Sequence, residues 1–196
     1  TFFVSPNFGR SQIYMSLIKL TKAQNLQAQG TLEEAKTLFE ELLFTSPKMF
    51  DALHGLGMIE AQLGNMEKAL LFLEQASPPE QKKGLYYLHL GHIYRKLKKI
   101  DKAIDSYQKA QVSGLNSLDL HLLLANLYNI NTDTNAAIRE FDSELKLNPA
   151  SIEAHYQLGL HFLKNRSYDF ANVQFNNVLA LDPEHINAIF HSGVCA

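Results

Sequence analysis

Apolar residues recur along this chain at three- and four-residue steps, in blocks of about a dozen residues separated by short polar turns. In one block the apolar positions are Leu85, Leu88, Leu90, Ile93, Tyr94 and Leu97. This spacing places apolar side chains on one face of a helix. The blocks end at turn residues such as Gly30-Thr31 and Gly64-Asn65, and several pairs of blocks close at a proline, which cannot continue a helix. The pattern therefore predicts an all-α chain of short helices joined in pairs.

The pattern repeats every 34 residues, with one column of alanines in the second helices, one of glycine or alanine in the first helices, and one of large apolar residues. The columns are Ala35, Ala69, Ala103, Ala137 and Ala171; Ala23, Gly57, Gly91, Ala125, Gly159 and Gly193; and Phe39, Leu73, Tyr107, Phe141 and Phe175. Glycine inside a helix costs about 1 kcal/mol relative to alanine, so the small residues indicate a neighbouring helix that leaves no room for a larger side chain. A period of this length is typical of a solenoid.

We divide the chain into five repeats, at 16–49, 50–83, 84–117, 118–151 and 152–185. A flanking segment at 1–15 precedes them, and the first helix of a truncated sixth repeat follows at 186–196. The prediction is one elongated domain. No methionine opens the chain and Cys195-Ala196 falls inside a helical pattern, so we expect a piece of a longer protein.

The unit resembles the tetratricopeptide repeat. The third repeat carries the residues typical of that family at Tyr87, Leu90, Gly91, Tyr94, Ala103, Tyr107 and Ala110, and the fifth carries them at His155, Leu158, Gly159, Phe162, Ala171, Phe175 and Pro183. The resemblance implies a right-handed superhelical solenoid of antiparallel helix pairs, whose first helices line a concave groove that binds protein ligands. The third repeat departs from the pattern with Leu115 at the usual proline, so we expect its junctions to bend differently.

The composition argues against several classes of function. Eighteen basic and 20 acidic residues give a net charge of −2, which provides no general attraction for nucleic acid. No apolar run is long enough to insert into a membrane. The single cysteine excludes an internal disulfide and is compatible with a reducing compartment such as the cytoplasm. Motifs for phosphate-binding loops, metalloproteases or serine hydrolases are absent, so we expect neither an enzyme within this segment nor a bound cofactor.

The histidines are the remaining candidates for chemistry. His121 and His155 occupy a position at which the family packs a large residue between helices, so we interpret them as packed rings with a hydrogen-bonded nitrogen. His89 and His92 are three residues apart and could share a helix face as metal ligands. With no carboxylate or cysteine in register beside them, we predict no metal site.

The resemblance places ligand-contacting residues at positions 2, 5, 9 and 12 of the first helices. The candidates there are Leu20, Gln24, His54, Met58, Leu88, His92, Arg95, Leu122, Asn126, Tyr156 and Leu160. Position 5 holds no lysine, so the carboxylate clamp of members that bind chaperone tails is absent, and Asn126 alone does not form an asparagine ladder. The stripe is mainly apolar, which suits an extended peptide or an amphipathic helix of a partner protein. Some of these residues could instead pack between adjacent first helices.

A group of cations at the end of the second repeat and in the third permits two interpretations. It consists of Lys82, Lys83, Arg95, Lys96, Lys98, Lys99 and Lys102. It could contact an acidic stretch of a partner, or it could be a solvated turn between helices. A nucleic-acid interface would require a longer basic stripe than the following acidic residues allow.

The leading hypothesis is a non-catalytic scaffold that holds a peptide or helix of a partner in the groove. The alternative is an arm that presents a substrate or partner to a catalytic domain outside this segment, such as a glycosyl-, sulfo- or methyltransferase. Self-association is a third option, because a solenoid that stops at Ile189, Phe190 and Val194 exposes an apolar end.

Overall fold

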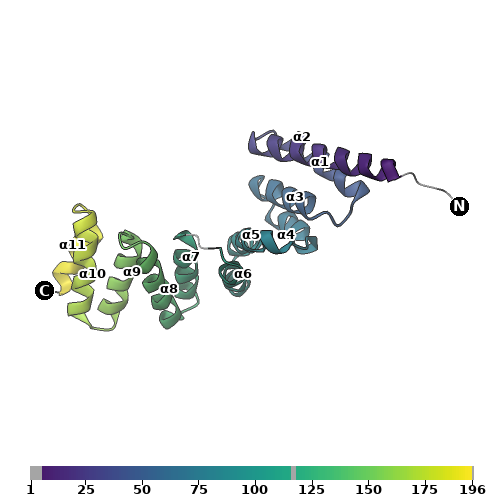
Figure 1. Cartoon of the computed structure of the whole chain (residues 1–196). Coiled ribbons are helices and arrows are strands. Elements are labelled where there is room, and N and C mark those ends of the chain that lie inside the picture. The colour runs from purple at the N-terminus through teal and green to yellow at the C-terminus, as the bar shows by residue number, and fades with distance from the viewer. Residues whose placement is uncertain (1–5, 116–117, 196) are drawn as a thin grey trace. The chain divides into compact units, whose positions relative to one another are not determined.

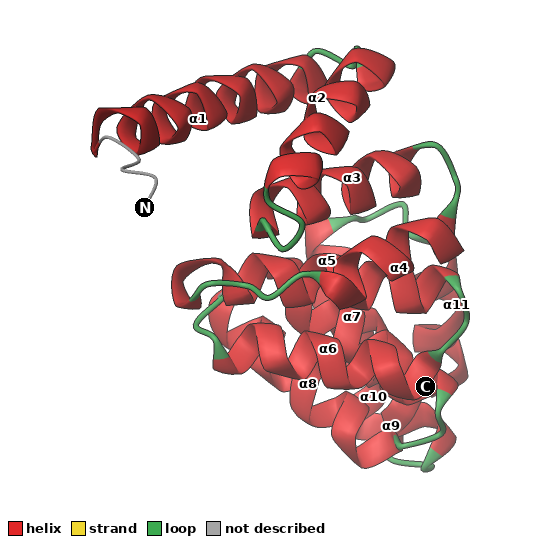
Figure 2. Cartoon of the chain, turned by 90° about the vertical axis from the view of Figure 1, so that its right-hand side faces the viewer, coloured by secondary structure: helices red, strands yellow, loops and turns green. Residues whose placement is uncertain are grey.

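The computed structural model describes residues 6–115 and 118–195, and in this part of the chain every regular element is helical (Figure 2). The first helices of the pairs, here called A helices, are α1 (Pro6–Ala28), α3 (Phe50–Gln62), α5 (Lys83–Lys96), α7 (Leu118–Ile130), α9 (Ile152–Lys164) and α11 (Ile186–Cys195). The second, or B, helices are α2 (Leu32–Thr45), α4 (Met66–Gln75), α6 (Ile100–Val112), α8 (Thr134–Leu147) and α10 (Tyr168–Leu181). A short 3₁₀ turn, η1 (Glu80–Lys82), precedes α5. The all-α repeat fold is confirmed.

The chain forms two compact units, residues 1–113 and 114–196, where the sequence predicts one domain. In the first unit α1 packs on α2, α3 on α4 and α5 on α6; in the second α7 packs on α8 and α9 on α10 (Figure 1). The division falls at Gly114, whose φ is 80°, just before the position at which the third repeat has Leu115 instead of proline. The sequence marks this junction as unusual, but the 34-residue period continues across it and conceals the division.

Each A helix of a pair ends in the same hydrogen-bonded turn. The residue at the apex has a positive φ: Gly30 81°, Gly64 86°, Lys98 58°, Thr132 61° and Arg166 59°. In the third turn the Lys98 N–H donates to the Arg95 carbonyl and the Lys99 N–H to the Tyr94 carbonyl, and the other four turns make the equivalent pair of bonds. This is the Schellman pattern, which satisfies the last carbonyls of a helix and favours glycine at the apex. The polar turns predicted between the helices are therefore present.

Three of the B helices end two residues before a proline. Helices α2, α8 and α10 stop at Thr45, Leu147 and Leu181, two residues before Pro47, Pro149 and Pro183 respectively. Helix α1 is longer than the pattern predicts, because it begins at Pro6, ten residues before the expected start of the first repeat.

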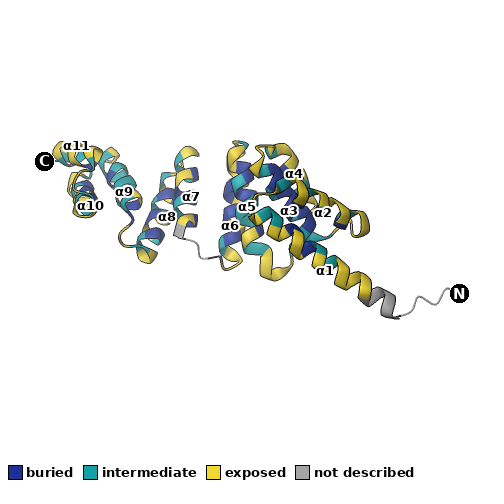
Figure 3. Cartoon of the chain, turned by 90° about the horizontal axis from the view of Figure 1, so that it is seen from above, coloured by how far each residue is buried: buried dark blue, intermediate teal, exposed yellow. Residues whose placement is uncertain are grey.

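The core runs between the paired helices (Figure 3). All members of the alanine column and of the large apolar column are fully buried. A β-carbon placed on Gly91 would lie 2.4 Å from Tyr107 Cε1, and one on Gly159 would lie 2.6 Å from Phe175 Cε1. The predicted packing of small A-helix residues against large B-helix rings is confirmed. Gly193 in α11 differs, since no heavy atom lies within 4 Å of its β-carbon position.

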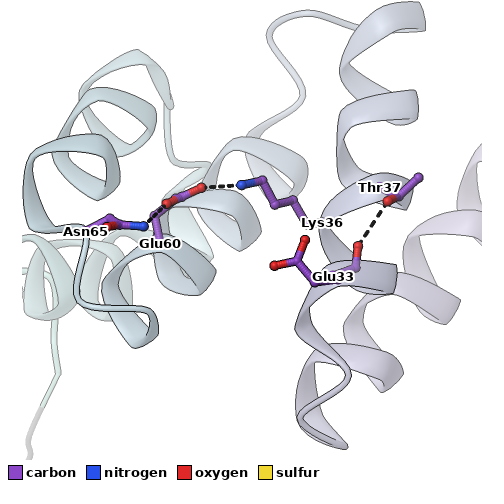
Figure 4. Close-up of polar contacts among 5 residues, drawn as sticks. All are labelled: Glu33, Lys36, Thr37, Glu60 and Asn65. Atoms are coloured by element: carbon purple, nitrogen blue, oxygen red, sulfur yellow. Dashed lines mark hydrogen bonds and ion pairs between the residues drawn. The ribbon is translucent and has the colours of Figure 1, made fainter.

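A buried carboxylate joins the first two helix pairs (Figure 4). Glu60 of α3 is 2% exposed, and its Oε1 accepts a hydrogen bond of 2.6 Å from Lys36 Nζ of α2. Its Oε2 accepts one of 2.8 Å from Asn65 Nδ2, in the turn that follows α3. Tyr94 occupies the equivalent position one repeat later and its hydroxyl contacts Glu74 of α4 at 2.9 Å. In both repeats this position therefore binds the B helix of the preceding pair.

Candidate functional site

The A helices of the first unit carry seven of the predicted binding residues, which we call the A-helix face of unit 1: Leu20, Gln24, His54, Met58, Leu88, His92 and Arg95. Helix α3 contacts both α1 and α5, so the three elements that bear this face are neighbours. Gln24 and Arg95 are exposed, and four of the others are half-buried. Leu20 is only 7% exposed and packs into the core with Phe39 and Leu56, which leaves little of it for a partner.

Two histidines form a direct pair on this face. His54 Nε2 of α3 lies 2.9 Å from His89 Nδ1 of α5, and the two rings are stacked with centroids 5.1 Å apart. Phe50 stacks on the other side of His54. Burial lowers the pKa of His89 to about 4, with a further contribution from the neighbouring His54, and burial also lowers the pKa of His54. Both shifts favour the neutral rings, and the hydrogen bond requires that at least one of the two nitrogens is unprotonated to accept it.

A second polar cluster lies one turn further along α5. His92 Nδ1 is 2.8 Å from the Tyr107 hydroxyl. Either the hydroxyl donates to Nδ1 or a protonated Nδ1 donates to the hydroxyl, according to the tautomer of the ring. Burial is the main cause of the lowered pKa of His92, with Arg95 as the second cause. The sequence places His89 and His92 on one helix as a candidate metal pair, whereas the structure gives each a different partner.

The A helices of the second unit carry the other four residues, Leu122, Asn126, Tyr156 and Leu160, which form the A-helix face of unit 2. Asn126 is exposed and the other three are half-buried. The Tyr156 ring packs against His185 at 5.1 Å between centroids, and burial raises the pKa of its hydroxyl. This face therefore presents part of an aromatic cluster and aliphatic side chains.

His121 and His155 confirm the interpretation as packed rings. His121 Nδ1 lies 2.7 Å from Glu140 Oε2, and His155 Nδ1 lies 2.7 Å from Gln174 Oε1. In residues 6–115 and 118–195, no group of three or more histidine, cysteine or acidic side chains is placed to hold a metal ion. Within the same residues no helix combines the length and the apolar character that crossing a membrane requires.

The sequence did not single out a cavity of about 1030 Å³ beside the start of α1. Ile13 and Leu17 of α1 and Met49 of the α2–α3 loop give it an apolar wall, and Ser46 and Lys48 contribute polar groups. None of its lining residues is among the eleven predicted binding residues. The length of α1 could have revealed this cavity, because the apolar spacing continues upstream of the first repeat through Ile13.

Comparison with known proteins agrees with this architecture. Two tetratricopeptide repeat family models match residues 20–81 and 85–111. The bovine BBSome complex member BBS4 is 29% identical over 166 residues, which cover 84% of this chain and 32% of that protein. Anaphase-promoting complex subunit 3 of Schizosaccharomyces pombe is 24% identical over 84% of this chain and 25% of its own length. The chain therefore spans a third or less of these relatives.

Solved structures show the same fold at low sequence identity. MamA superposes with a TM-score of 0.72 at 19% identity, covering 84% of this chain and 96% of that one. YrrB, described as a tetratricopeptide repeat protein with an unusual peptide-binding site, superposes with a TM-score of 0.67 at 22% identity, covering 80% and 81% respectively. The helix pairs and their columns define a helical repeat protein. Tetratricopeptide repeats are therefore present at residues 20–81 and 85–111 of this chain.

Proposed function

We propose that this chain is a non-catalytic scaffold that binds an extended peptide or a helix of a partner protein on its A-helix faces. The observation that carries the proposal is the combination of apolar side chains and neutral polar groups on these faces. On unit 1, Leu88 and Met58 are half-buried rather than sealed in the core, and Leu85 is 48% exposed. Such groups give apolar anchors to a bound segment.

The polar groups of the same face suit a peptide backbone. His54 and His92 each use one ring nitrogen within the fold, which leaves the other nitrogen for a partner, and exposed Gln24 and Asn126 can both donate and accept. Two relatives are named as members of multi-protein complexes, and one structural neighbour is described as binding a peptide. These descriptions support an interaction role, although they belong to those proteins.

The test replaces one apolar anchor on each face with a charge. We expect the double variant Leu88→Glu and Leu122→Glu to lose at least nine-tenths of the partner captured from an extract of the source cells, measured by quantitative mass spectrometry. A buried charge in the bound state has no compensating group, so the effect on capture is large. Circular dichroism should show unchanged helicity.

The matched control places the same charges on B helices. Val112 of α6 is 90% exposed and Val173 of α10 is 55% exposed, so Val112→Glu with Val173→Glu adds two acids away from the A-helix faces. This control should capture the partner normally. Full capture by the Leu88 and Leu122 double variant, or equal loss in the control, would contradict the proposal.

A further inference from the structure

The turn between α5 and α6 presents a concentrated positive charge. Arg95, Lys96, Lys98 and Lys99 are all exposed within five residues. The Schellman hydrogen bonds at this turn, 3.0 Å from Lys98 N and 2.9 Å from Lys99 N, fix the backbone that carries them. In the part of the chain that the structure describes, Lys96, Lys98 and Lys99 make no ion pair. The charges are thus held close together and remain available to a ligand.

The equivalent turns of the same chain show that the fold does not require these charges. The residues at the four positions are Gln27, Ala28, Gly30 and Thr31 in the first turn, and Ala61, Gln62, Gly64 and Asn65 in the second. Both turns adopt the same positive φ and the same hydrogen bonds without any charge. The four cations of the third turn are therefore an addition to a turn that forms without them.

Two of the lysines also oppose local structural preferences. Lys98 has a φ of 58°, in the left-handed region that favours glycine, which the first two turns use. Lys99 is the N-cap of α6, whereas the N-caps of the other four B helices are Thr31, Asn65, Asp133 and Ser167, residue types that are favoured at this position. Of the five, only Asp133 makes a side-chain capping bond. A cation at a helix N-terminus is also unfavourable to the helix dipole. The dipole of α5 explains Arg95 and Lys96 at its C-terminus, but it does not explain Lys99 at the start of the next helix.

We propose that the α5–α6 turn is a docking surface for an acidic segment of a partner protein. Residue types that are unfavourable for the local backbone conformation, and that stabilise nothing in exchange, are typical of functional sites. The patch is one turn long, which matches a few neighbouring carboxylates, and Arg95 can hold one of them in a bidentate pair. A nucleic acid would require a longer basic track, and the net charge of −2 does not attract a polyanion. Arg95 belongs to both this surface and the A-helix face of unit 1, whereas Lys96, Lys98 and Lys99 lie outside that face, so the three lysines test this proposal separately from the function proposed above.

The test grafts the second turn onto the third. The variant Lys96→Gln, Lys98→Gly and Lys99→Asn installs residues that the chain already uses at Gln62, Gly64 and Asn65 and leaves Arg95 in place. The probe is a fluorescein-labelled peptide of ten glutamates, with a Gly-Ser peptide of equal length for comparison, followed by fluorescence anisotropy at low salt. We expect the wild type to bind the acidic peptide only, and the variant to bind it at least about tenfold more weakly because the charge pairs are lost.

The same variant should melt at a higher temperature than the wild type, because it relieves the left-handed lysine and removes a cation from the N-terminus of α6. Weaker peptide binding together with higher stability would show that the lysines serve docking, because lysines with a structural role would lower the stability when they are replaced. A lowered melting temperature would contradict the claim that the lysines oppose the fold. The single variant Lys99→Asn, which changes only the cap, should show the same two changes on a smaller scale.

The matched control removes the same charge elsewhere. Lys146→Gln, Lys164→Gln and Arg166→Gly also eliminate three exposed cations, and the last of these relieves a left-handed turn residue in unit 2. This variant should retain the affinity of the wild type. Equal weakening in the control, no binding by the wild type, or tighter binding to phosphatidylserine vesicles or a ten-nucleotide single-stranded DNA would each overturn the proposal.

Discussion

At the scale of single residues, glycines in the A helices make room for the B-helix side chains that follow 16 residues later. Gly57 faces Leu73, Gly91 faces Tyr107, and Gly159 faces Phe175, with β-carbon positions 2.4 to 2.9 Å from the nearest side-chain atom. The column was predictable because glycine in a helix interior needs a reason. Gly55, which leaves room for Phe39 at 2.5 Å, lies outside the column, and the period therefore did not reveal it.

Gly91→Ala should destabilise unit 1 by about 1–3 kcal/mol, because the new methyl group forces the buried Tyr107 ring to move. Urea unfolding followed by circular dichroism measures the change. Gly193→Ala is the control, since nothing lies within 4 Å of its β-carbon position and alanine favours the helix. A variant at Gly91 as stable as the wild type would show that the close contact can relax without cost.

The 34-residue period does not predict which buried positions hold an acidic residue. Glu144 of α8 is 1% exposed, and it occupies the position held by Leu42, Ala76, Ala110 and Val178 in the other repeats. Its Oε2 has no hydrogen-bond partner, and burial raises the pKa of its carboxyl above the ordinary value of 4.5, against smaller opposing effects of Asn148 and His121. A repeat pattern identifies a buried position, but it does not say how a charge there is compensated.

Glu144→Gln should stabilise unit 2 at pH 7 by about 1–2 kcal/mol, because it replaces a buried carboxylate with a neutral group of the same shape. A folded-state pKa raised above the unfolded value gives stability that is present below pH 4.5 and lost as the pH rises through the folded pKa. The advantage of the variant should therefore shrink as the pH falls to 4, in urea unfolding at several pH values. Asp142→Asn, at an exposed position of the same helix, should change little.

At the scale of elements, the contacts of Glu60 connect α2, α3 and the turn after α3 (Figure 4). The hydrogen bond from Lys36 is the main cause of the lowered pKa of Glu60, and the bond from Asn65 is the second. The family places a tyrosine at this position, so sequence comparison alone gave no reason to expect an ion pair. Helix ends, by contrast, were predictable, because prolines and turn residues act locally.

Lys36→Met should destabilise unit 1 by about 1–3 kcal/mol at pH 7, because Glu60 then keeps a buried charge with only Asn65 as a partner. A folded-state pKa below the unfolded value gives stability that is present above pH 4.5 and lost as the pH falls through the folded pKa. The difference in stability between Lys36→Met and the wild type should therefore disappear in acid. The difference for Glu144→Gln also shrinks in acid, but there the variant is the more stable protein, whereas here it is the less stable one. Lys48→Met, at an exposed loop position, is the control in thermal unfolding at each pH.

At the scale of the whole molecule, the sequence predicted the all-α repeat fold, and the binding role of the candidate faces stays a prediction. The three columns assign each residue a position within its repeat. The A-helix positions that could face a ligand therefore follow once the period is known. Which of them reach a partner depends on side-chain packing, as the buried Leu20 and the His54–His89 pair show. The division at Gly114 depends on how contacts are distributed among the helices, which a constant period does not record.

Each unit has a core of its own, so residues 1–113 should fold without the rest of the chain. The cluster around Phe39 and Leu56 lies wholly in unit 1, and the clusters around Phe141 and Phe175 lie wholly in unit 2. Because the stability of a repeat protein is a sum of repeat and nearest-neighbour terms, local substitutions should act within their own unit. We expect the 1–113 fragment to unfold cooperatively in urea, and Gly91→Ala to lower its stability as much as it does that of unit 1 in the full chain. A fragment without helicity, or a much smaller effect of Gly91→Ala in it, would show that the core of unit 1 requires the second unit.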